Sequence, residues 1–531
     1  MPEVETPPPH RTERSRSMTA LVSHVLSAVR PRSIVHFLSA VAISGALLAY
    51  IQFASPNIVG NDGYHHIKMA ELTLQQGLPL PFPWLPLTIL DEHGYSDRHM
   101  LLHVLQAPFT AFGDLGLASK WAAVTLAVFA CCVFYFFLVA YEVRYPFVWL
   151  LVLFASSHPF LYRMSMARGQ SLGLAFQLIA MYLILKRRPV GLGIVAMLFV
   201  WAYNAFPLIL LLVLIGLLTH YLVDGTFEYP LLIGAGIGVA CGLVVNPYFP
   251  QNIFLLWDHI VPKLFVVDYA TSVGGEWRPY NSWDLLSLSL GAHLAYGSAI
   301  FLTNREEWRQ DAPRLFLFLA ATLYAFLLFK SRRFIEYYPP ATVLLLAVGA
   351  RHWLKTLDVG SIAWTDRKIG GLILASLMLV AALQATVQAA WHDIHRLPPS
   401  DAYKGGAEWL AHNTPKGARV FHTDWDDFPR LFFFNTHNTY IVGLDPDFMR
   451  IKNKHLYERW KDITRGKVRL PARVIFQKFG CAYAFTDNKH RKFIALADRD
   501  PFMEKVYSDR HTTVYRVLDE NAEKTRLSPR G

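Results

Sequence analysis

The stretch "WAAVTLAVFACCVFYFFLVAY" (residues 121–141) contains 21 residues and not one charged side chain. An α-helix needs about 20 mainly apolar residues to cross the hydrocarbon core of a bilayer. The stretch therefore predicts a transmembrane helix, which we place at residues 118–141.

Similar apolar runs recur along the chain, at residues 34–53, 146–159, 171–186, 190–203, 205–222, 230–246, 287–303, 314–329, 337–352 and 369–390. The composition agrees, because 53% of the residues are hydrophobic and 17% are charged, against about 25% charged in soluble domains. The sequence predicts a polytopic α-helical membrane protein with about eleven transmembrane helices.

The net charge of +11 does not indicate nucleic-acid binding, because Lys and Arg lie mainly in loops and termini, where membrane topology places them. Four cysteines form no metal-binding or disulfide pattern. Anionic lipid or phosphate is the partner that this charge favours.

The distribution of Lys and Arg also predicts orientation. The Pro-, Arg- and Ser-rich residues 1–33 are expected to be a disordered cytoplasmic tail, followed by a transmembrane domain over residues 34–391 with long outer loops at 54–117 and 247–286. An odd number of spans places residues 392–531 outside, and their alternating and helical patterns predict a soluble extracytoplasmic α/β domain. We expect a multi-pass protein of the plasma (inner) membrane.

Two basic segments, "YRMSMARGQ" (162–170) and "KSRRFIEYYPP" (330–340), lie on the side where positive charge is disfavoured. Binding of an anion there is one explanation. Arg332 and Arg333 either extend to lipid headgroups or bind a lipid phosphate through their guanidinium groups.

Two acidic residues stand out in the outer loops. Asp62 in "GNDGYHH" is expected at a helix N-terminus, where its carboxylate can accept a proton, hold a divalent cation or simply face solvent. Glu276 in "TSVGGEWRPY" follows two glycines, which favours either a mobile loop that closes over a substrate or an acidic residue at headgroup level.

Two further patterns have a binding and a structural interpretation. In "SDRHMLLH", Asp97 and His99 with His103 form a weak metal-like pattern, and the alternative is helix capping with polar contacts. In "FHTDWDDFP", the residues Trp425, Asp426 and Asp427 form either a recognition surface for a polar or glycan acceptor or an acidic helix start.

Taken in order, these residues resemble the GT-C glycosyltransferases that use polyprenyl-linked sugars, and most of all the catalytic subunit of oligosaccharyltransferase. Asp62 stands where the family has its first-loop Asp, Glu276 resembles the late-loop Glu, and Arg333 followed by Phe334 resembles an Arg-Phe pair near the donor phosphate. The segment "DWDDFP" resembles the WWDYG motif. The likeness covers most of residues 34–450.

The resemblance implies an inverting transfer of a sugar or oligosaccharide from a polyprenyl-(pyro)phosphate donor, with Asp62 and Glu276 as catalytic residues. The family's second outer loop carries a further acidic metal-binding motif, whereas "RMSMARGQSLG" is basic here. The resemblance thus leaves two variants open: a divalent cation (Mg²⁺ or Mn²⁺) held by Asp62 and Glu276 with Asp97 or His99, or a metal-free site with one carboxylate as base. The acceptor, whether protein, lipid or polysaccharide, stays open.

Two other function classes remain. A transporter or flippase of a lipid-linked glycan predicts inverted repeats and charges at mid-membrane, whereas the polar residues here collect at one face. A non-catalytic glycan-binding protein of the cell envelope predicts that Asp62, Glu276 and Arg333 do not converge in space.

Overall fold

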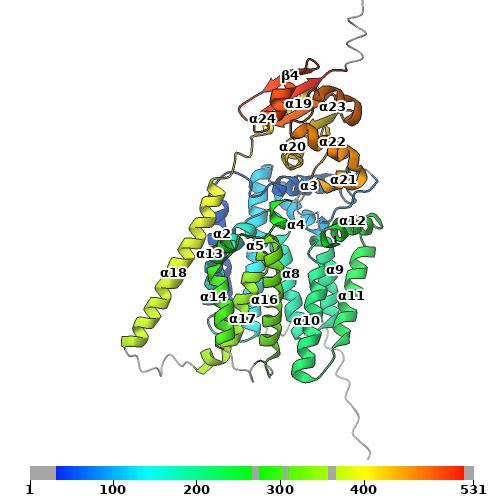
Figure 1. Cartoon of the computed structure of the whole chain (residues 1–531). Coiled ribbons are helices and arrows are strands. Elements are labelled where there is room, and N and C mark those ends of the chain that lie inside the picture. Colours follow the sequence, from blue (N-terminus) through cyan, green and yellow to red (C-terminus); the bar gives the residue numbers. More distant parts are fainter. Residues whose placement is uncertain are drawn as a thin grey trace, which may run out of the picture.

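A computed structural model describes residues 31–519 apart from 92, 266–273, 303–307, 309 and 357–365. A bundle of α-helices is followed by a mixed α/β region at one end of the bundle (Figure 1). The predicted tail of residues 1–33 lies almost wholly outside the described residues.

Every predicted apolar run overlaps a helix. These helices are α2 (Pro31–Gln52), α5 (Leu115–Ala140), α6 (Pro146–Ser156), α8 (Gln170–Leu185), α9 (Pro189–Ala202), α10 (Pro207–Asp224), α11 (Tyr229–Val244), α14 (Leu290–Phe301), α16 (Ala312–Lys330), α17 (Tyr338–Thr356) and α18 (Asp366–His395).

The lengths of these helices differ from the prediction of about eleven complete spans. Among the described residues, five helices (α2, α5, α10, α16 and α18) are long and apolar enough to cross a membrane. A sixth span results if α6 and α7 (His158–Met164) count as one helix bent by 98°, and α8, α9 and α11 are shorter apolar helices. The protein is therefore a polytopic membrane protein in which several predicted spans are short helices.

Local sequence explains where these helices begin and how closely they pack. The carboxylate of Asp114 accepts a hydrogen bond from the Leu117 backbone N–H and caps α5. Helices α9 and α11 approach closely at glycines, since a β-carbon on Gly238 would overlap the carbonyl of Gly193. A larger side chain at this crossing would force the two helices apart.

Two helices of the first long loop lie between the bundle and the α/β region (Figure 1), namely α3 (Asp62–Gln76) and α4 (Met100–Thr110). The loop between them is anchored by aromatic packing, because Phe82 and Trp84 belong to the same buried cluster as Phe428 and Phe432 of the α/β region. The first loop and the α/β region thus share one core, which fixes both over the end of the bundle.

The α/β region contains a five-stranded sheet in the order β2-β1-β3-β5-β4, with β2, β1 and β3 parallel and β5 antiparallel to both β3 and β4. The strands are β1 (Arg419–His422), β2 (Thr439–Tyr440), β3 (Tyr483–Asp487), β4 (Met503–Ser508) and β5 (Thr512–Val517). The helices are α19 (Lys404–Asn413), α20 (Phe428–Phe434), α21 (Asp447–Lys452), α22 (Lys454–Thr464), α23 (Pro471–Phe479) and α24 (Arg491–Ala497). The turn that holds Trp425 follows the carboxyl end of β1, where ligand-binding groups of parallel sheets commonly lie.

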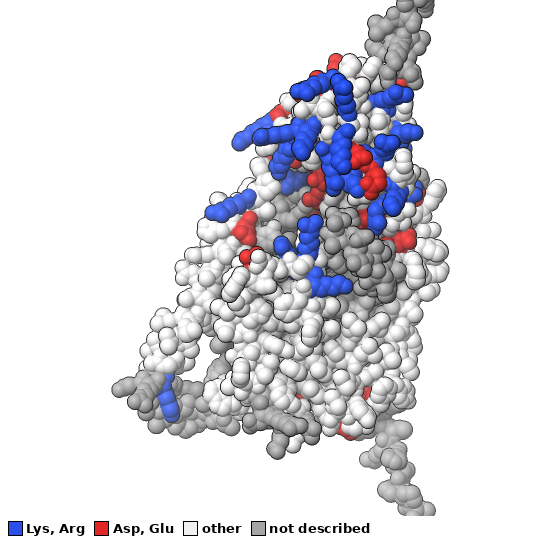
Figure 2. Space-filling model, in the orientation of Figure 1, with Lys and Arg blue, Asp and Glu red and all other residues white. Residues whose placement is uncertain are grey.

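Charged side chains are distributed unevenly over the surface. Figure 2 shows Lys and Arg gathered over the α/β region and its junction with the bundle, whereas the bundle below carries almost no charge on this face. An uncharged band of this kind is what a lipid-facing surface requires. The junction is therefore the place where polar chemistry meets the membrane-embedded helices.

Candidate functional site

The two carboxylates singled out from the sequence meet at one arginine. Asp62 is the first residue of α3, and Glu276 lies in the short 3₁₀ helix η2 (Gly275–Trp277). Arg168, between α7 and α8, contacts both: its Nη2 lies 2.9 Å from Asp62 Oδ2, and its Nη1 lies 3.2 Å from Glu276 Oε2. Asp62 and Glu276, from two distant loops, are thus bridged by a guanidinium group.

Two more arginines surround Glu276. Arg163 Nη1 lies 3.4 Å and Arg333 Nε 3.8 Å from its carboxylate. Burial raises the pKa of Glu276, but the charges of Arg168, Arg333 and Arg163 outweigh it and hold this pKa well below its usual value. Glu276 is therefore ionised at neutral pH and serves as a counter-ion for the arginine cluster.

Arg333 and Arg332 face different surroundings. Arg333 donates a hydrogen bond of 3.0 Å to the Tyr203 hydroxyl, and its guanidinium carbon lies 4.6 Å from the centre of the Trp277 ring. Arg332 instead donates to the Pro279 carbonyl and stacks over Tyr280. The structure thus brings Arg333 to the carboxylates, whereas Arg332 turns away from them.

A buried glutamate completes the charge balance. Glu336 ends the 3₁₀ helix η3 (Arg332–Glu336) and forms an ion pair with Arg163, with Nε 2.7 Å from its Oε1. The three guanidinium groups of Arg163, Arg168 and Arg333 thus face the three carboxylates of Asp62, Glu276 and Glu336. Sequence reasoning noticed the misplaced positive charge of segment 162–170 but did not assign these pairs.

The turn after β1 lies over this cluster. The Asn61 side-chain amide donates to both the carbonyl and the carboxylate of Asp426, at 2.6 and 2.9 Å. On the other side, a β-carbon on Gly274 would lie 3.7 Å from the Trp425 ring. Trp425 and Asp426 therefore stand next to the loops that carry Asp62 and Glu276.

Asp426 and Asp427 differ in environment. Withdrawal from water and then the nearby Asp62 carboxylate raise the pKa of Asp426 to about 6. Asp427 is buried, and its carboxylate accepts hydrogen bonds from the Asp424 backbone N–H and the Tyr403 hydroxyl. The prediction that Asp427 contacts an acceptor does not fit this position, since Asp427 fixes the turn, as the capping alternative proposed.

The Asp97 and His99 pattern forms a buried hydrogen-bonded chain. Asp97 accepts hydrogen bonds from His103 Nδ1 at 2.6 Å and from the His99 backbone N–H at 2.9 Å, and His103 Nε2 lies 2.8 Å from His66 Nδ1. Burial lowers the pKa of His66 and of His99 well below the usual value, so both imidazoles are neutral. The chain orders the first loop beside the arginine cluster.

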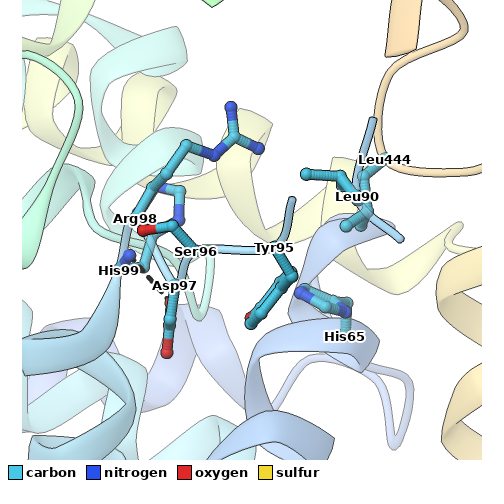
Figure 3. Close-up of a pocket in the computed structure, with 8 residues that line it drawn as sticks. All are labelled: His65, Leu90, Tyr95, Ser96, Asp97, Arg98, His99 and Leu444. Atoms are coloured by element: carbon cyan, nitrogen blue, oxygen red, sulfur yellow. Dashed lines mark hydrogen bonds between the residues drawn. The ribbon is translucent and has the colours of Figure 1, made fainter. Parts of the chain in front are cut away.

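Next to this chain lies a small cavity of about 20 Å³, room for about one water molecule (Figure 3). Arg98 lines it and extends away from Asp97 in the close-up. The Arg98 Nη1 atom is buried and has no hydrogen-bond partner among the described residues. Arg333 is near enough for its charge to act on Arg98. A fourth guanidinium, whose Nη1 has no partner among the described residues, therefore stands near the three of the cluster.

The residues present do not fit a divalent cation. Mg²⁺ prefers six oxygen ligands, yet Asp62 and Glu276 are both engaged by Arg168, and the Asp97 oxygens by His103 and the His99 N–H. Within the described part of the chain, no group of three or more His, Cys, Asp or Glu could hold a metal ion. The four residues predicted as metal ligands therefore do not assemble into a metal site.

No family model and no curated protein match this chain. Solved structures do match its fold. The oligosaccharyltransferase AglB from Archaeoglobus fulgidus, in complex with an inhibitory peptide and a dolichol-phosphate, matches with a TM-score of 0.63 and 14% identity over 87% of this chain and 71% of that one.

ArnT from Cupriavidus metallidurans, bound to undecaprenyl phosphate, matches with a TM-score of 0.54 and 14% identity over 92% of this chain and 98% of that one. The arabinofuranosyltransferase AftD from Mycobacteria matches with a TM-score of 0.52 and 13% identity over 91% of this chain and 40% of its own. All three are GT-C glycosyltransferases, so the predicted GT-C-like fold is confirmed.

Proposed function

We propose that this chain, which shares the fold of AglB, ArnT and AftD, is a membrane glycosyltransferase that transfers a sugar or oligosaccharide from a polyprenyl-linked donor. One observation carries the proposal: Asp62, Glu276 and Arg333 meet in one cluster of ion pairs, which lies where the apolar bundle meets the α/β region. A passive scaffold has no need for that convergence.

The layout suits a lipid-linked donor. The AglB and ArnT structures contain dolichol-phosphate and undecaprenyl phosphate, which have a polyprenyl chain for the bilayer and a phosphate for its surface. In this protein the uncharged bundle would bind the polyprenyl tail of the donor. Arg333, which is held by the Tyr203 hydroxyl, would bind the phosphate. The Nη1 atom of Arg98, which has no hydrogen-bond partner among the described residues, would donate to a further oxyanion of the donor headgroup.

The Asp62 carboxylate has the position for a proton acceptor. Arg168 engages its Oδ2 atom, and the side chain keeps 29% of its surface exposed. In the proposed step, the acceptor proton passes to Asp62 while the acceptor atom bonds to the anomeric carbon from the face opposite the phosphate. The bond from that carbon to the phosphate oxygen breaks, its electron pair stays on the phosphate, and Arg333 stabilises the charge.

The acceptor would enter beneath the turn of Trp425 and Asp426, which lies over the carboxylates. We propose that this end of the bundle faces the extracytoplasmic side, as the charge distribution predicts, with residues 392–531 as the outer domain. Lipid-linked sugar profiling would identify the sugar.

Lipid-linked sugar profiling of a deletion strain tests the proposal. We expect the unused donor to accumulate and the wild-type gene to clear it. Asp62→Asn should fold normally and fail to clear it, because loss of a proton acceptor reduces transfer by about 10²–10⁴-fold. Asp91→Asn, in the same loop but paired with Lys452 away from the cluster, is the matched control and should behave as wild type. An unchanged lipid pool in the deletion strain would refute the proposed function.

A further inference from the structure

We infer that Arg168 does in this site the work that a divalent cation does between two carboxylates, so that transfer by this protein needs no metal ion. The inference rests on the proposed function for its chemistry. Its geometric basis is independent of function: a guanidinium group lies between Asp62 and Glu276, the two side chains predicted to share a cation.

The contacts of Arg168 are those of a bidentate bridge. Nη1 and Nη2 lie 3.2 and 3.3 Å from the two oxygens of Glu276, and Nη2 also lies 2.9 Å from Asp62. The side chain is 13% exposed, so little water competes for these contacts. A guanidinium is always charged and matches carboxylates with a planar fork of donors.

The backbone around Arg168 holds it in this place. A β-carbon on Gly63, next to Asp62, would lie 3.7 Å from the Ala167 β-carbon, so the start of α3 packs directly on the segment before Arg168. On the other side, a β-carbon on Gly169 would lie 2.6 Å from Tyr203 Cδ2. Only glycine lets the Tyr203 ring come so close, and the arginine is thereby fixed between two packed neighbours.

The charges around Arg168 also disfavour a metal ion. Arg163 and Arg333 both lie within 4 Å of Glu276. A divalent cation bound there would face the repulsion of three guanidinium groups at short range in a partly buried site. The same groups favour an anion, because a donor phosphate gains from each of them.

A guanidinium and a metal ion differ in what they offer the substrate. Arg168 supplies a fixed positive charge and N–H donors, but it does not coordinate a water molecule or an acceptor atom as a metal ion does. It orients the Asp62 carboxylate through Oδ2 and neutralises Glu276, so both acidic groups are tolerated beside an anionic donor. Arg168 is therefore a positioning residue that acts through Asp62.

The experiment uses the full-length protein in lipid nanodiscs and has two readouts. The first is Mn²⁺ binding measured by electron paramagnetic resonance, which needs no substrate. Wild-type protein should bind no Mn²⁺ at concentrations near that of the protein. Arg168→Ala frees Asp62 and removes one of the three guanidinium groups at Glu276, so it should bind Mn²⁺ more tightly. Stoichiometric Mn²⁺ on the wild-type protein, removed by Asp62→Asn, would overturn the inference.

The second readout is transfer from the donor found by lipid profiling, with and without EDTA. We expect the wild-type rate to be unchanged by EDTA and the Arg168→Ala rate to fall by about 10²–10³-fold, the effect of losing one preorganised charged donor. Arg168→Lys, which keeps the charge but not the fork, should retain folding and recover only part of the rate. A wild-type rate that EDTA abolishes and Mn²⁺ restores would overturn the inference while leaving the proposed function intact.

Arg187→Ala is the matched control. Arg187 is also an ion-paired arginine, but it lies by Asp224 and Glu228, apart from the cluster. This variant should transfer at the wild-type rate and bind no Mn²⁺. Absence of any transfer by the wild-type protein would contradict the proposed function, and the Mn²⁺ measurement would still decide the inference.

Discussion

The side-chain amide of Asn61 donates to both the backbone carbonyl and the carboxylate of Asp426, and so joins the residue before Asp62 to the turn that carries Trp425. Arg430 strengthens the link, because its Nε donates to the Asn61 Oδ1 atom at 3.1 Å. This amide therefore joins the turn of Trp425 directly to the residue before the Asp62 carboxylate.

This link leads to a prediction about Asn61→Leu. The substitution keeps the size of the side chain and removes its hydrogen bonds, so the turn loses its fixed distance from Asp62. We expect kcat/KM for the acceptor to fall by about tenfold, which corresponds to one hydrogen bond of about 1.4 kcal/mol, while donor binding is unchanged. Steady-state kinetics with either substrate varied will check it, and an equal loss in donor affinity would contradict it.

A second prediction concerns pH. The pKa of Asp426 is raised to about 6 by withdrawal from water and by Asp62. Protonation of Asp426 below that pH removes the negative charge beside the carboxylate that is proposed to accept the proton, so we expect transfer to fall as pH drops through about 6. The Asp426→Asn variant should lack this pH-dependent change and should transfer at the low rate at every pH.

Asp426 also affects the stability of the fold, which should decrease with rising pH over the range where transfer increases. The pKa of Asp426 is about 6 in the folded protein and has the ordinary value of 3.8 in the unfolded chain, so the folded state holds this proton more tightly. The bound proton therefore stabilises the fold below about pH 4, and this stabilisation is lost as the pH rises through about 6. Thermal unfolding measured across this range should show a shallower loss of stability in Asp426→Asn than in wild type. An identical pH dependence in both proteins would count against the assigned pKa.

A third prediction concerns Arg98. Its Nη1 atom is buried and has no hydrogen-bond partner in the described part of the chain, so the unliganded protein carries an incompletely satisfied cation. Arg98→Met should therefore raise the melting temperature of the unliganded protein and weaken binding of undecaprenyl diphosphate by about tenfold or more, as expected for hydrogen bonds to a charged group. Ligand-dependent thermal shifts will measure both effects.

A comparison of two ligands and a control variant define the role of Arg98. A larger loss for undecaprenyl diphosphate than for undecaprenyl phosphate will show that Arg98 binds the second phosphate. An equal loss of affinity for both ligands will show that Arg98 binds the phosphate that the two ligands share. Arg144→Gln, where the arginine bonds to the Leu354 carbonyl at the end of α17, should change neither affinity. Unchanged binding in Arg98→Met would remove the residue from the donor site.

A fourth prediction concerns Gly169→Ala. The new methyl group would lie 2.6 Å from Tyr203 Cδ2, so the ring or the backbone next to Arg168 must shift. We expect a loss of about 1–3 kcal/mol in stability, typical of overpacking, together with a reduced transfer rate. Gly236→Ala is the control, because no atom lies within 4 Å of its added carbon. Full activity in Gly169→Ala would show that Arg168 tolerates displacement.

Several features were predictable because they depend on local sequence. All the long apolar runs form helices, since a backbone in lipid must satisfy its own hydrogen bonds, and the helix is the local way to do so. The misplaced basic segments at 162–170 and 330–340 also indicated where the polar cluster lies, since Arg163, Arg168 and Arg333 of these segments meet there. Both inferences need only composition and order along the chain.

Other features were not predictable, because they depend on which distant segments pack together. The neighbours Arg332 and Arg333 carry the same charge, and both were expected at the donor phosphate. Of the two, Arg333 reaches Glu276 and Arg332 bonds to the Pro279 carbonyl, because the turn of η3 points them in different directions. Asp426 and Asp427 are separated in the same way, with one facing Asn61 and the other buried under Tyr403.

The sequence by itself determined the helical membrane architecture, the presence of an α/β region after it and the segments that carry polar chemistry, since each follows from periodicity and hydrophobicity within a few turns of chain. Only the tertiary structure decided that Asp62 and Glu276 pair with Arg168 rather than assemble a set of metal ligands. Ion pairs between distant loops depend on distances of a few ångströms, and these are set by how helices and glycines pack in three dimensions.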